Sequence, residues 1–324
     1  MVIVAKRSRT SPTLPPMTWH SRQLAQQTGR TFVITGANSG IGVEAARDLV
    51  SRGAHVVLAV RDTRKGEQAR ATFGGGLGSS SVHELDLADL DSVASFAKTM
   101  NAEHTGVHAL VCNAGVMGGP YLLTAQGFER QMATNHLGHA ALVTALWPLL
   151  HATAGRVVTV SSIAARGGRL TGTTTRGELV DPGSSYDSKR AYGNSKQANL
   201  LFAQELHRRA GAAGSPVSSI CVHPGVSNTN LFAAQLQEGG KRLLAPLSKV
   251  VTRIALQPAA AGALPILRAL DHSTPSGAFV GPKKLGQVRG RPELLEVYPS
   301  GKDRDAATRL WELTEDVLGV PLPV

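Results

Sequence analysis

The sequence has few of the residues that would support a disulfide-stabilised or metal-binding protein. Its 324 residues include only two cysteines, Cys112 and Cys221, which are too few for a disulfide framework or a zinc site. Both lie in apolar, strand-like segments. We therefore expect buried free thiols in a reducing compartment, and thus a cytoplasmic protein.

Long apolar runs are also missing. No window reaches the roughly 18 consecutive apolar residues that a membrane span requires, so no membrane span is expected. The apolar start at residues 1–5 is followed at once by Lys6 and Arg7, which leaves it too short for the core of a signal peptide. Proline and serine come next, and we interpret residues 1–28 as a flexible N-terminal extension.

Aromatic residues make up only 4% of the chain and hydrophobic residues 42%, which predicts an aliphatic, alanine-rich core. Acidic residues are outnumbered by basic ones, and the formal net charge is +11. Residues 1–30 contain no acidic residue, and their basic residues are Lys6, Arg7, Arg9, Arg22 and Arg30. Because no basic stripe alternates with aromatic residues, nucleic-acid binding is not expected.

From residue 29 onward, short apolar segments alternate with amphipathic, helix-like segments. The expected strands are residues 30–36, 55–60, 82–85, 107–111, 156–161, 217–222 and 278–280. The expected helices are residues 41–52, 63–72, 90–103, 128–150, 191–210 and 304–318. This alternation predicts a single α/β domain over residues 29–324, a doubly wound, Rossmann-type, mostly parallel seven-stranded sheet with helices on both faces.

Two segments interrupt the alternation, residues 164–185 and residues 226–275. Both follow the carboxyl ends of strands, which is where ligands bind in such folds. The second contains Leu231, Phe232 and Leu236, and we expect it to cover a lipophilic substrate. The alternative is that these residues only pack a pair of helices.

A glycine-rich turn joins the first expected strand to the first expected helix. Gly36 permits the turn, Gly40 allows the backbone to approach a pyrophosphate, and Gly42 allows the helix to pack closely on the sheet. The free N–H groups at the start of the helix would face the phosphates. The segment predicts a dinucleotide site formed by Gly36, Asn38, Ser39, Gly40, Ile41 and Gly42.

The residue that ends the second strand distinguishes NAD from NADP. Where an acid would accept hydrogen bonds from the ribose hydroxyls of NAD, this chain has Val60, followed by Arg61. A guanidinium at that place would pair with the 2′-phosphate of NADP. NADP(H) is therefore the expected cofactor, and Asp62 keeps NAD as the alternative if the strand is one residue longer.

Tyr192 and Lys196 are four residues apart in an expected helix, so they share one face. We expect the charge of Lys196 to lower the pKa of the Tyr192 phenol. Such a phenol can donate a proton to a carbonyl or accept one from an alcohol. Tyr186 is the alternative, but Arg190 follows it at the same spacing and suits that role poorly, so we choose Tyr192.

The spacing of the glycines in residues 36–42 and the Tyr-x-x-x-Lys pair resemble those of the short-chain dehydrogenase/reductase family. The resemblance covers residues 30–320. It is strongest to the branch of retinol dehydrogenases, protochlorophyllide reductases and uncharacterised actinobacterial oxidoreductases, and its carrying segments are residues 59–62, 134–139, 191–196 and 309–313. We expect no membrane anchor like that of retinol-type enzymes, and the chain does not have the extra cysteines of the protochlorophyllide reductases. We therefore do not expect retinol or protochlorophyllide to be the substrate on the basis of this resemblance.

The resemblance implies further site residues. Ser162 matches the catalytic serine of the family, with Ser161 as the alternative, and Asn135 matches the helix asparagine that holds a water between the lysine and solvent. Tyr192 and Lys196 complete this catalytic set and also contact the cofactor. The other implied cofactor contacts are Asp86, Leu87, Asn113, Ala114, Gly115, Pro224, Gly225, Val226 and Thr229.

Together these features predict an NADP(H)-dependent enzyme that transfers a hydride between nicotinamide and the carbonyl or alcohol of a lipophilic small molecule. His136 and His139 are three residues apart, but no third ligand accompanies them, so no metal is expected. A non-catalytic NADP-binding sensor on the same fold is the alternative. A sugar-nucleotide epimerase would need a different glycine spacing. Family members often pair through their long central helices, which makes a homodimer or homotetramer the default.

Overall fold

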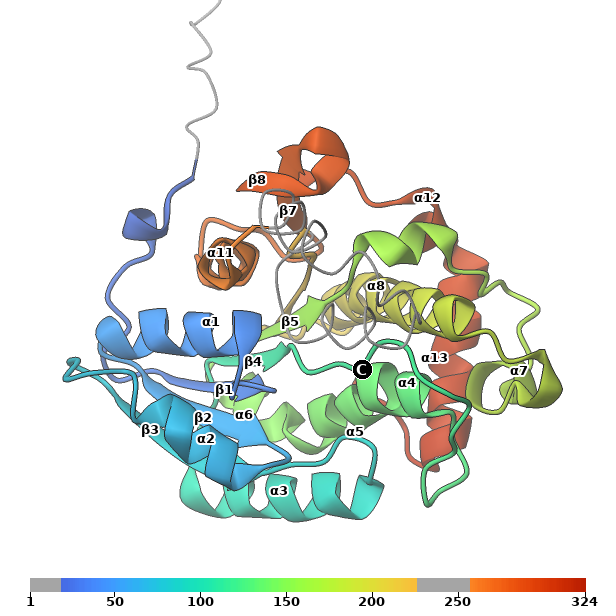
Figure 1. The fold of residues 1–324 in the computed structure, drawn as a ribbon, viewed down its shortest axis with the longest axis horizontal. Coiled ribbons are helices and arrows are strands. Elements are labelled where there is room, and N and C mark those ends of the chain that lie inside the picture. Colours follow the sequence, from blue (N-terminus) through green and yellow to red (C-terminus); the bar gives the residue numbers. More distant parts are fainter. Residues whose placement is uncertain (1–18, 226–256) are drawn as a thin grey trace, which may run out of the picture.

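The computed structural model describes residues 19–225 and 257–324 of the chain. These residues form an eight-stranded sheet with the strand order β3-β2-β1-β4-β5-β6-β7-β8 (Figure 1). The strands are β1 Thr31–Thr35, β2 His55–Val60, β3 Ser79–Glu84, β4 Ala109–Cys112, β5 Arg156–Val160, β6 Ser218–Val222, β7 Phe279–Lys284 and β8 Arg289–Leu295. The order reverses between β1 and β4, which opens a crevice at the carboxyl ends of these strands.

Helices cover both faces of the sheet (Figure 1). The longer helices are α1 Gly40–Ser51, α2 Thr63–Arg70, α3 Leu90–Glu103, α5 Gly138–Ala145, α8 Ser188–Ala212, α11 Ala259–Leu270 and α13 Arg304–Leu318. The core on one face joins α1 and α11 to strand residues such as Ile34 and Leu58, and the core on the other joins α3, α5, α8 and α13 to Val33 and Val57. Alternate residues of β1 and β2 thus face opposite cores, as the pleat of a strand requires.

Shorter elements connect these helices and strands. The α-helical ones are α4 Arg130–Met132, α6 Trp147–Ala152, α7 Arg176–Val180 and α12 Pro299–Lys302. The others are the 3-10 turns η1 Ser21–Gln23, η3 Ile163–Gly167, η4 Gly183–Ser185 and η6 Leu285–Gln287, and the π-helical turn η2 Ala133–Leu137. No helix within the described residues is long and apolar enough to cross a membrane.

The prediction of one doubly wound, mostly parallel domain is confirmed, with one strand more than expected. Strand β8 pairs antiparallel with β7 at the sheet edge, and the register shifts between Pro282 and Lys284. Its sequence, RGRPELL, carries proline, glycine and charge, and only Pro292 is buried. An edge strand tolerates such residues because one of its sides makes no ladder bonds, so its apolar pattern is weak.

The helix expected over residues 128–150 is divided. A π-helical turn separates α4 from α5, and α6 begins anew after Leu146, with Pro148 in its first turn. Proline lacks the N–H that would continue the preceding helix, which explains the second break. The π-helical turn places Asn135 and matters for the site described below.

The packed part of the chain begins before residue 29, where the sequence placed the start of the domain. Leu24 is buried, and the indole N–H of Trp19 donates to Asp271 at 2.9 Å. Residues 1–18 and 226–256 lie outside the described residues, and with them Val226, Thr229 and most of the expected substrate-covering segment. The described end of that segment contains α11, whose Ile266 and Leu267 are buried against α1 and the sheet.

Candidate active site

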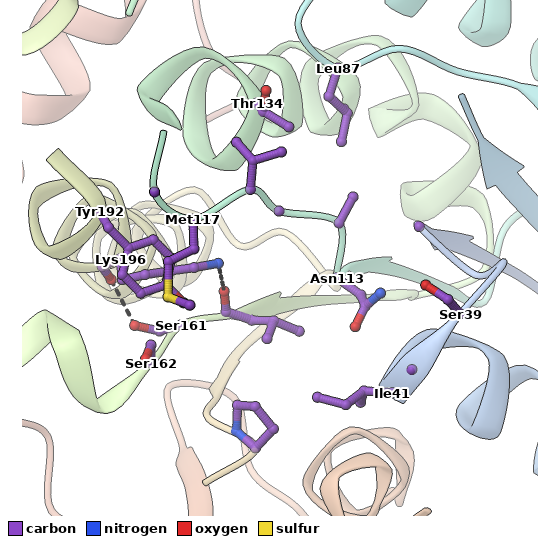
Figure 2. Close-up of a pocket in the computed structure, with 18 of the residues that line it drawn as sticks. Ser39, Ile41, Leu87, Asn113, Met117, Thr134, Ser161, Ser162, Tyr192 and Lys196 are labelled. Atoms are coloured by element: carbon purple, nitrogen blue, oxygen red, sulfur yellow. Dashed lines mark hydrogen bonds between the residues drawn. The ribbon is translucent and has the colours of Figure 1, made fainter. Parts of the chain in front are cut away.

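A cavity of about 550 Å³ lies at the carboxyl ends of the central strands. The turn before α1 forms one side, and Ser162, Tyr192 and Lys196 gather at the other side (Figure 2). The structure brings together nearly all of the described residues that the sequence assigned to the site. The cavity is lined by Gly36, Asn38, Ser39, Gly40, Ile41, Arg61, Asp86, Leu87, Asn113, Ala114, Gly115, Ser162, Tyr192, Lys196, Pro224 and Gly225, among others.

The glycine turn has the backbone that the sequence suggested. Gly36 and Gly40 have positive φ angles of 66° and 58°, which side chains other than glycine rarely adopt. A Cβ on Gly42 would lie 2.6 Å from Nδ2 of Asn113 and 2.8 Å from the carbonyl oxygen of Gly36. Ser39 precedes α1 without a side-chain hydrogen bond to the helix, so the side chain of Ser39 caps no N–H group of the first turn, and Ser39, Gly40 and Ile41 line the cavity. This is a cradle that fits a phosphate.

Thr35, at the end of β1, is a residue whose role the sequence reasoning missed. Its hydroxyl accepts hydrogen bonds from the backbone N–H groups of Asn113 and Ala114, each at 2.9 Å. The side chain of Asn113 donates to the carbonyl oxygen of Thr35 at 2.8 Å. These bonds hold the loop after β4 against the glycine turn, and both segments line the cavity. No spacing in the sequence reveals contacts between residues 78 positions apart.

The charged end of the cavity contains Arg61, Asp62 and Lys65. Arg61 is exposed and makes no ion pair among the described residues. Asp62 caps α2 by accepting from the N–H of Lys65 at 3.0 Å, and its carboxylate lies 3.5 Å from the ammonium of Lys65. The backbone bond from Lys65 holds the pKa of Asp62 below its ordinary value. Asp62 is therefore occupied as a helix cap, while Arg61 is available to a ligand.

Tyr192 and Lys196 lie on α8 beside Ser161 and Ser162, which follow β5 (Figure 2). The Lys196 ammonium is 5.8 Å from the centre of the Tyr192 ring and donates to the carbonyl oxygen of Val160 at 3.1 Å. Ser161 is buried and donates to the carbonyl oxygen of Lys196 at 2.7 Å, which ties β5 to α8. Ser162 is the serine whose hydroxyl contacts the Tyr192 phenol.

Burial dominates the ionisation of the pair. It raises the pKa of Tyr192, and the hydrogen bond from Ser162 opposes this in part. It lowers the pKa of Lys196 to about 8. The expectation that Lys196 depresses the pKa of Tyr192 is therefore wrong for this structure, because desolvating a phenolate costs more than its surroundings return.

Asn135 lies on the π-helical turn, fully buried. Its side chain accepts from the N–H of Val116 at 2.7 Å and donates to the carbonyl oxygen of Val116 at 2.9 Å, and it also donates to Ser195. A Cβ on Gly115 would lie 3.1 Å from Oδ1 of Asn135 and 3.4 Å from Nζ of Lys196. Asn135 thus fixes the loop that passes beside Lys196. π-Helical turns occur frequently at functional sites.

Tyr186, the alternative to Tyr192, lies elsewhere. Tyr186 lines a second cavity of about 320 Å³, and its hydroxyl bonds to Gln131 and to the carbonyl oxygen of Gly119. His136 bonds to Thr314 and His139 to Thr35, so the two rings point to different partners. Within residues 19–225 and 257–324, no group of three or more His, Cys, Asp or Glu side chains could hold a metal.

Several lining residues were not anticipated. Lys65, in α2, is four residues after Arg61, and the run of basic residues there was a signal that could have found it. Thr134 neighbours Asn135, and Ser188 and Lys189 begin α8. Met117 comes from the irregular loop after β4, where no periodicity indicates which side chains face the cavity.

Comparison with known proteins agrees with this geometry. Residues 30–174 match the model of the short chain dehydrogenase family. Mouse retinol dehydrogenase 11 is 37% identical over 302 residues, covering 92% of this chain and 89% of that protein. The chain belongs to the short-chain dehydrogenase family. Human retinol dehydrogenase 12, 37% identical over 306 residues with 92% and 89% covered, places it in the retinol dehydrogenase-like branch.

Solved structures show the same relationship. An uncharacterised protein from Mycobacterium paratuberculosis is 41% identical, with a TM-score of 0.77 and 95% of this chain and 100% of that one covered. A Beutenbergia cavernae protein described as an NAD(P)-dependent gluconate 5-dehydrogenase with bound NADP is 25% identical, with a TM-score of 0.57 and 75% and 90% covered. As a short-chain dehydrogenase, this chain is an NAD(P)-binding oxidoreductase that acts on an alcohol or carbonyl of a small molecule.

Proposed function

We propose that this short-chain dehydrogenase uses NADP(H) to interconvert an apolar alcohol and its carbonyl. One observation carries the proposal. A phenol, a serine hydroxyl and a buried ammonium, from Tyr192, Ser162 and Lys196, meet in the same cavity as a glycine turn and the exposed guanidinium of Arg61. Such a cavity can hold a dinucleotide and a substrate carbonyl together.

The residues present fit NADP(H). The glycine turn and the start of α1 would hold the pyrophosphate, Asp86 and Leu87 the adenine, and Pro224 and Gly225 the carboxamide. Asn113, Ala114 and Gly115 would line the floor, where small side chains leave room. When bound, NADPH supplies the hydride that reduces the carbonyl carbon.

The protein residues would manage the proton and the developing negative charge. Tyr192 would donate its phenolic proton to the carbonyl oxygen in the reductive direction and accept one from the alcohol in the oxidative direction. Ser162 would donate a hydrogen bond to the same oxygen. Lys196 would bind the ribose hydroxyls and return a proton to Tyr192, with Asn135 holding the water that links Lys196 to solvent. Carbon gains the hydride and oxygen the proton, so the step balances.

The preference for NADP(H) is supported by the charges at the adenosine end. Arg61 is exposed and makes no ion pair among the described residues, Lys65 lines the same end of the cavity, and Asp62 is held as the cap of α2. An acid that is already bonded to α2 is a poor partner for the ribose hydroxyls of NAD, whereas two cations suit a phosphate dianion.

The substitution Arg61→Ala is expected to weaken NADPH binding by about 10- to 100-fold, since charge-assisted bonds contribute about 1.5–3 kcal/mol, and to leave NADH binding nearly unchanged. Fluorescence titration with both cofactors measures this. Arg64→Ala is the matched control, because Arg64 is an exposed neighbour that does not line the cavity. Equal losses for NADPH and NADH would contradict the phosphate assignment.

An apolar substrate is supported by two features. Val116, Met117 and Ile163 line the cavity, and the related proteins reported above are retinol dehydrogenases by name. Two buried free cysteines, in which burial raises the thiol pKa, support a reducing compartment such as the cytoplasm.

A screen of NADPH consumption against aldehydes, ketones and quinones of increasing apolar surface tests the proposal. We expect turnover that improves with apolar surface. NADPH binding without oxidation against any carbonyl would instead favour a non-catalytic sensor on the same fold.

A further inference from the structure

His139 is a buried titratable residue for which the proposed chemistry has no use. It lies on α5, is 3% exposed and does not line the cavity. Both of its ring nitrogens nevertheless bond to residues around the site. Nδ1 is 3.0 Å from the backbone carbonyl oxygen of Asn135, and Nε2 is 2.9 Å from the hydroxyl oxygen of Thr35.

These partners determine where the ring proton sits. A carbonyl oxygen can only accept, so Nδ1 carries the proton and donates to Asn135. Nε2 is then an acceptor, and the hydroxyl of Thr35 must donate to it. Both lone pairs of that hydroxyl remain free to accept the N–H groups of Asn113 and Ala114. A single arrangement of protons therefore satisfies both ring nitrogens of His139, the hydroxyl of Thr35 and the groups bonded to them.

The ring stays neutral, as this arrangement requires. Burial lowers the pKa of His139 to about 4, and the charge of Lys196 acts in the same direction, whereas the bond to Asn135 opposes it. A protonated ring would place an N–H against the hydroxyl of Thr35, which would then have to turn its own proton to the more distant carbonyl oxygen of Val111, at 3.3 Å. His139 is thus a fixed donor and acceptor.

We infer that His139 is a positioning residue that couples the loop after β4, through Thr35, to the π-helical turn that carries Asn135. The inference rests on the proposed function, since it concerns the same site. In the π-helical turn the N–H of Gly138 donates to the carbonyl oxygen of Ala133, five residues earlier. The carbonyl oxygen of Asn135, in the same turn, lies 3.0 Å from Nδ1 of His139.

The coupling matters because Asn135 is bonded on two sides. Its backbone accepts from His139, and its side chain holds Val116 by two hydrogen bonds. The intervening loop passes between Asn135 and Lys196 at Gly115, where there is no room for a Cβ without close contact. A displacement of Asn135 would therefore move the loop and the surroundings of the Lys196 ammonium together.

The test compares two buried histidines in the same helical region. His139→Leu removes both bonds, and His139→Gln keeps a group that can donate and accept. His136 is the matched control, because it is 1% exposed and bonds to Thr314 on α13, away from the cavity. The controls are His136→Leu and His136→Gln. We would measure the Tm of all four variants, and then their NADPH affinity, kcat and KM at a temperature well below each Tm.

We expect His139→Leu to weaken NADPH binding about tenfold and to lower kcat about tenfold, because two buried groups lose their partners. His139→Gln should recover most of both. The His136 variants should be less stable than the wild type, but their NADPH affinity and kcat should stay within about twofold of the wild-type values. This is the result expected for a buried residue that contributes only to stability. A merely structural role of His139 would lower Tm without these changes.

Wild-type NADPH affinity and kcat in His139→Leu would overturn the inference, and so would equal losses in His136→Leu. An NMR measurement on the ¹⁵N-histidine-labelled wild type covers the case in which a variant fails to fold. It should show neutral His139 protonated at Nδ1, and protonation at Nε2 would also overturn the inference. Wild-type protein that binds NADPH but reduces no carbonyl would refute only the oxidoreductase proposal, because the affinity measurements still test His139.

Discussion

Tyr192→Phe is expected to lower kcat by about 10²–10⁴-fold, the usual contribution of a positioned acid or base, while NADPH affinity stays nearly unchanged. The substitution deletes one oxygen and keeps the ring that packs beside Lys196 at 5.8 Å. The proton donor is therefore lost, but the shape of the cavity is kept. Steady-state kinetics with the best carbonyl from the screen, together with a fluorescence titration of NADPH, measure both quantities.

Tyr186→Phe is the matched control for this variant. Tyr186 is a tyrosine of the same region that bonds to Gln131 and lines the second cavity instead. We expect the loss of the Tyr186 hydroxyl to change kcat by no more than a few-fold. Full activity in Tyr192→Phe, or a larger loss in Tyr186→Phe, would remove Tyr192 from the role of acid and base.

Lys196→Met is expected to abolish measurable turnover and at the same time to stabilise the protein at neutral pH. Lys196 is 4% exposed, and burial lowers the pKa of its ammonium from 10.5 to about 8. That difference corresponds to about 3 kcal/mol by which the buried charge destabilises the folded state. Methionine keeps the length and the packing of the side chain without the charge.

The pH dependence has a defined sign. Between pH 8 and 10.5 the unfolded chain binds the proton of Lys196 more readily than the folded protein, so wild-type stability rises with pH through this window. The advantage of Lys196→Met is therefore largest below pH 8 and shrinks toward pH 10.5. Urea unfolding of both proteins at pH 7 and pH 10 measures it. A variant less stable than the wild type at pH 7 would show that the bond to Val160 outweighs the cost of burying the charge.

Most of the fold could be read from residue order because its signals are local. The strands β1, β2 and β5 are short apolar runs, and α1 and α13 have clear apolar faces and helix-ending glycines nearby. β8 could not be found in this way, since it is an edge strand with proline and charge. The division of the helix around Asn135 was missed as well, because a π-helical turn has no composition of its own.

In the candidate site, too, the features that could be predicted are those with a local sequence pattern. Glycines at fixed spacing, Arg61 after a strand and Tyr192 four residues before Lys196 are local patterns with a chemical meaning, and the structure brings them to one cavity. The ionisation of the pair could not be predicted from spacing alone. Distance to a charge favours one direction and burial the other, and only the packed structure shows that burial is the larger effect for Tyr192.

The sequence by itself determined the order of strands β1 to β7, the glycine turn and the residue types available to a hydride-transfer site, because each depends on neighbours within a few positions along the chain. Only the tertiary structure decided that Ser161 ties β5 to α8 while Ser162 meets the phenol, and that His139 joins Thr35 to Asn135. These are choices among equivalent polar groups. They depend on which hydrogen-bond partner, in many cases dozens of residues away, comes within 3 Å once the core has packed.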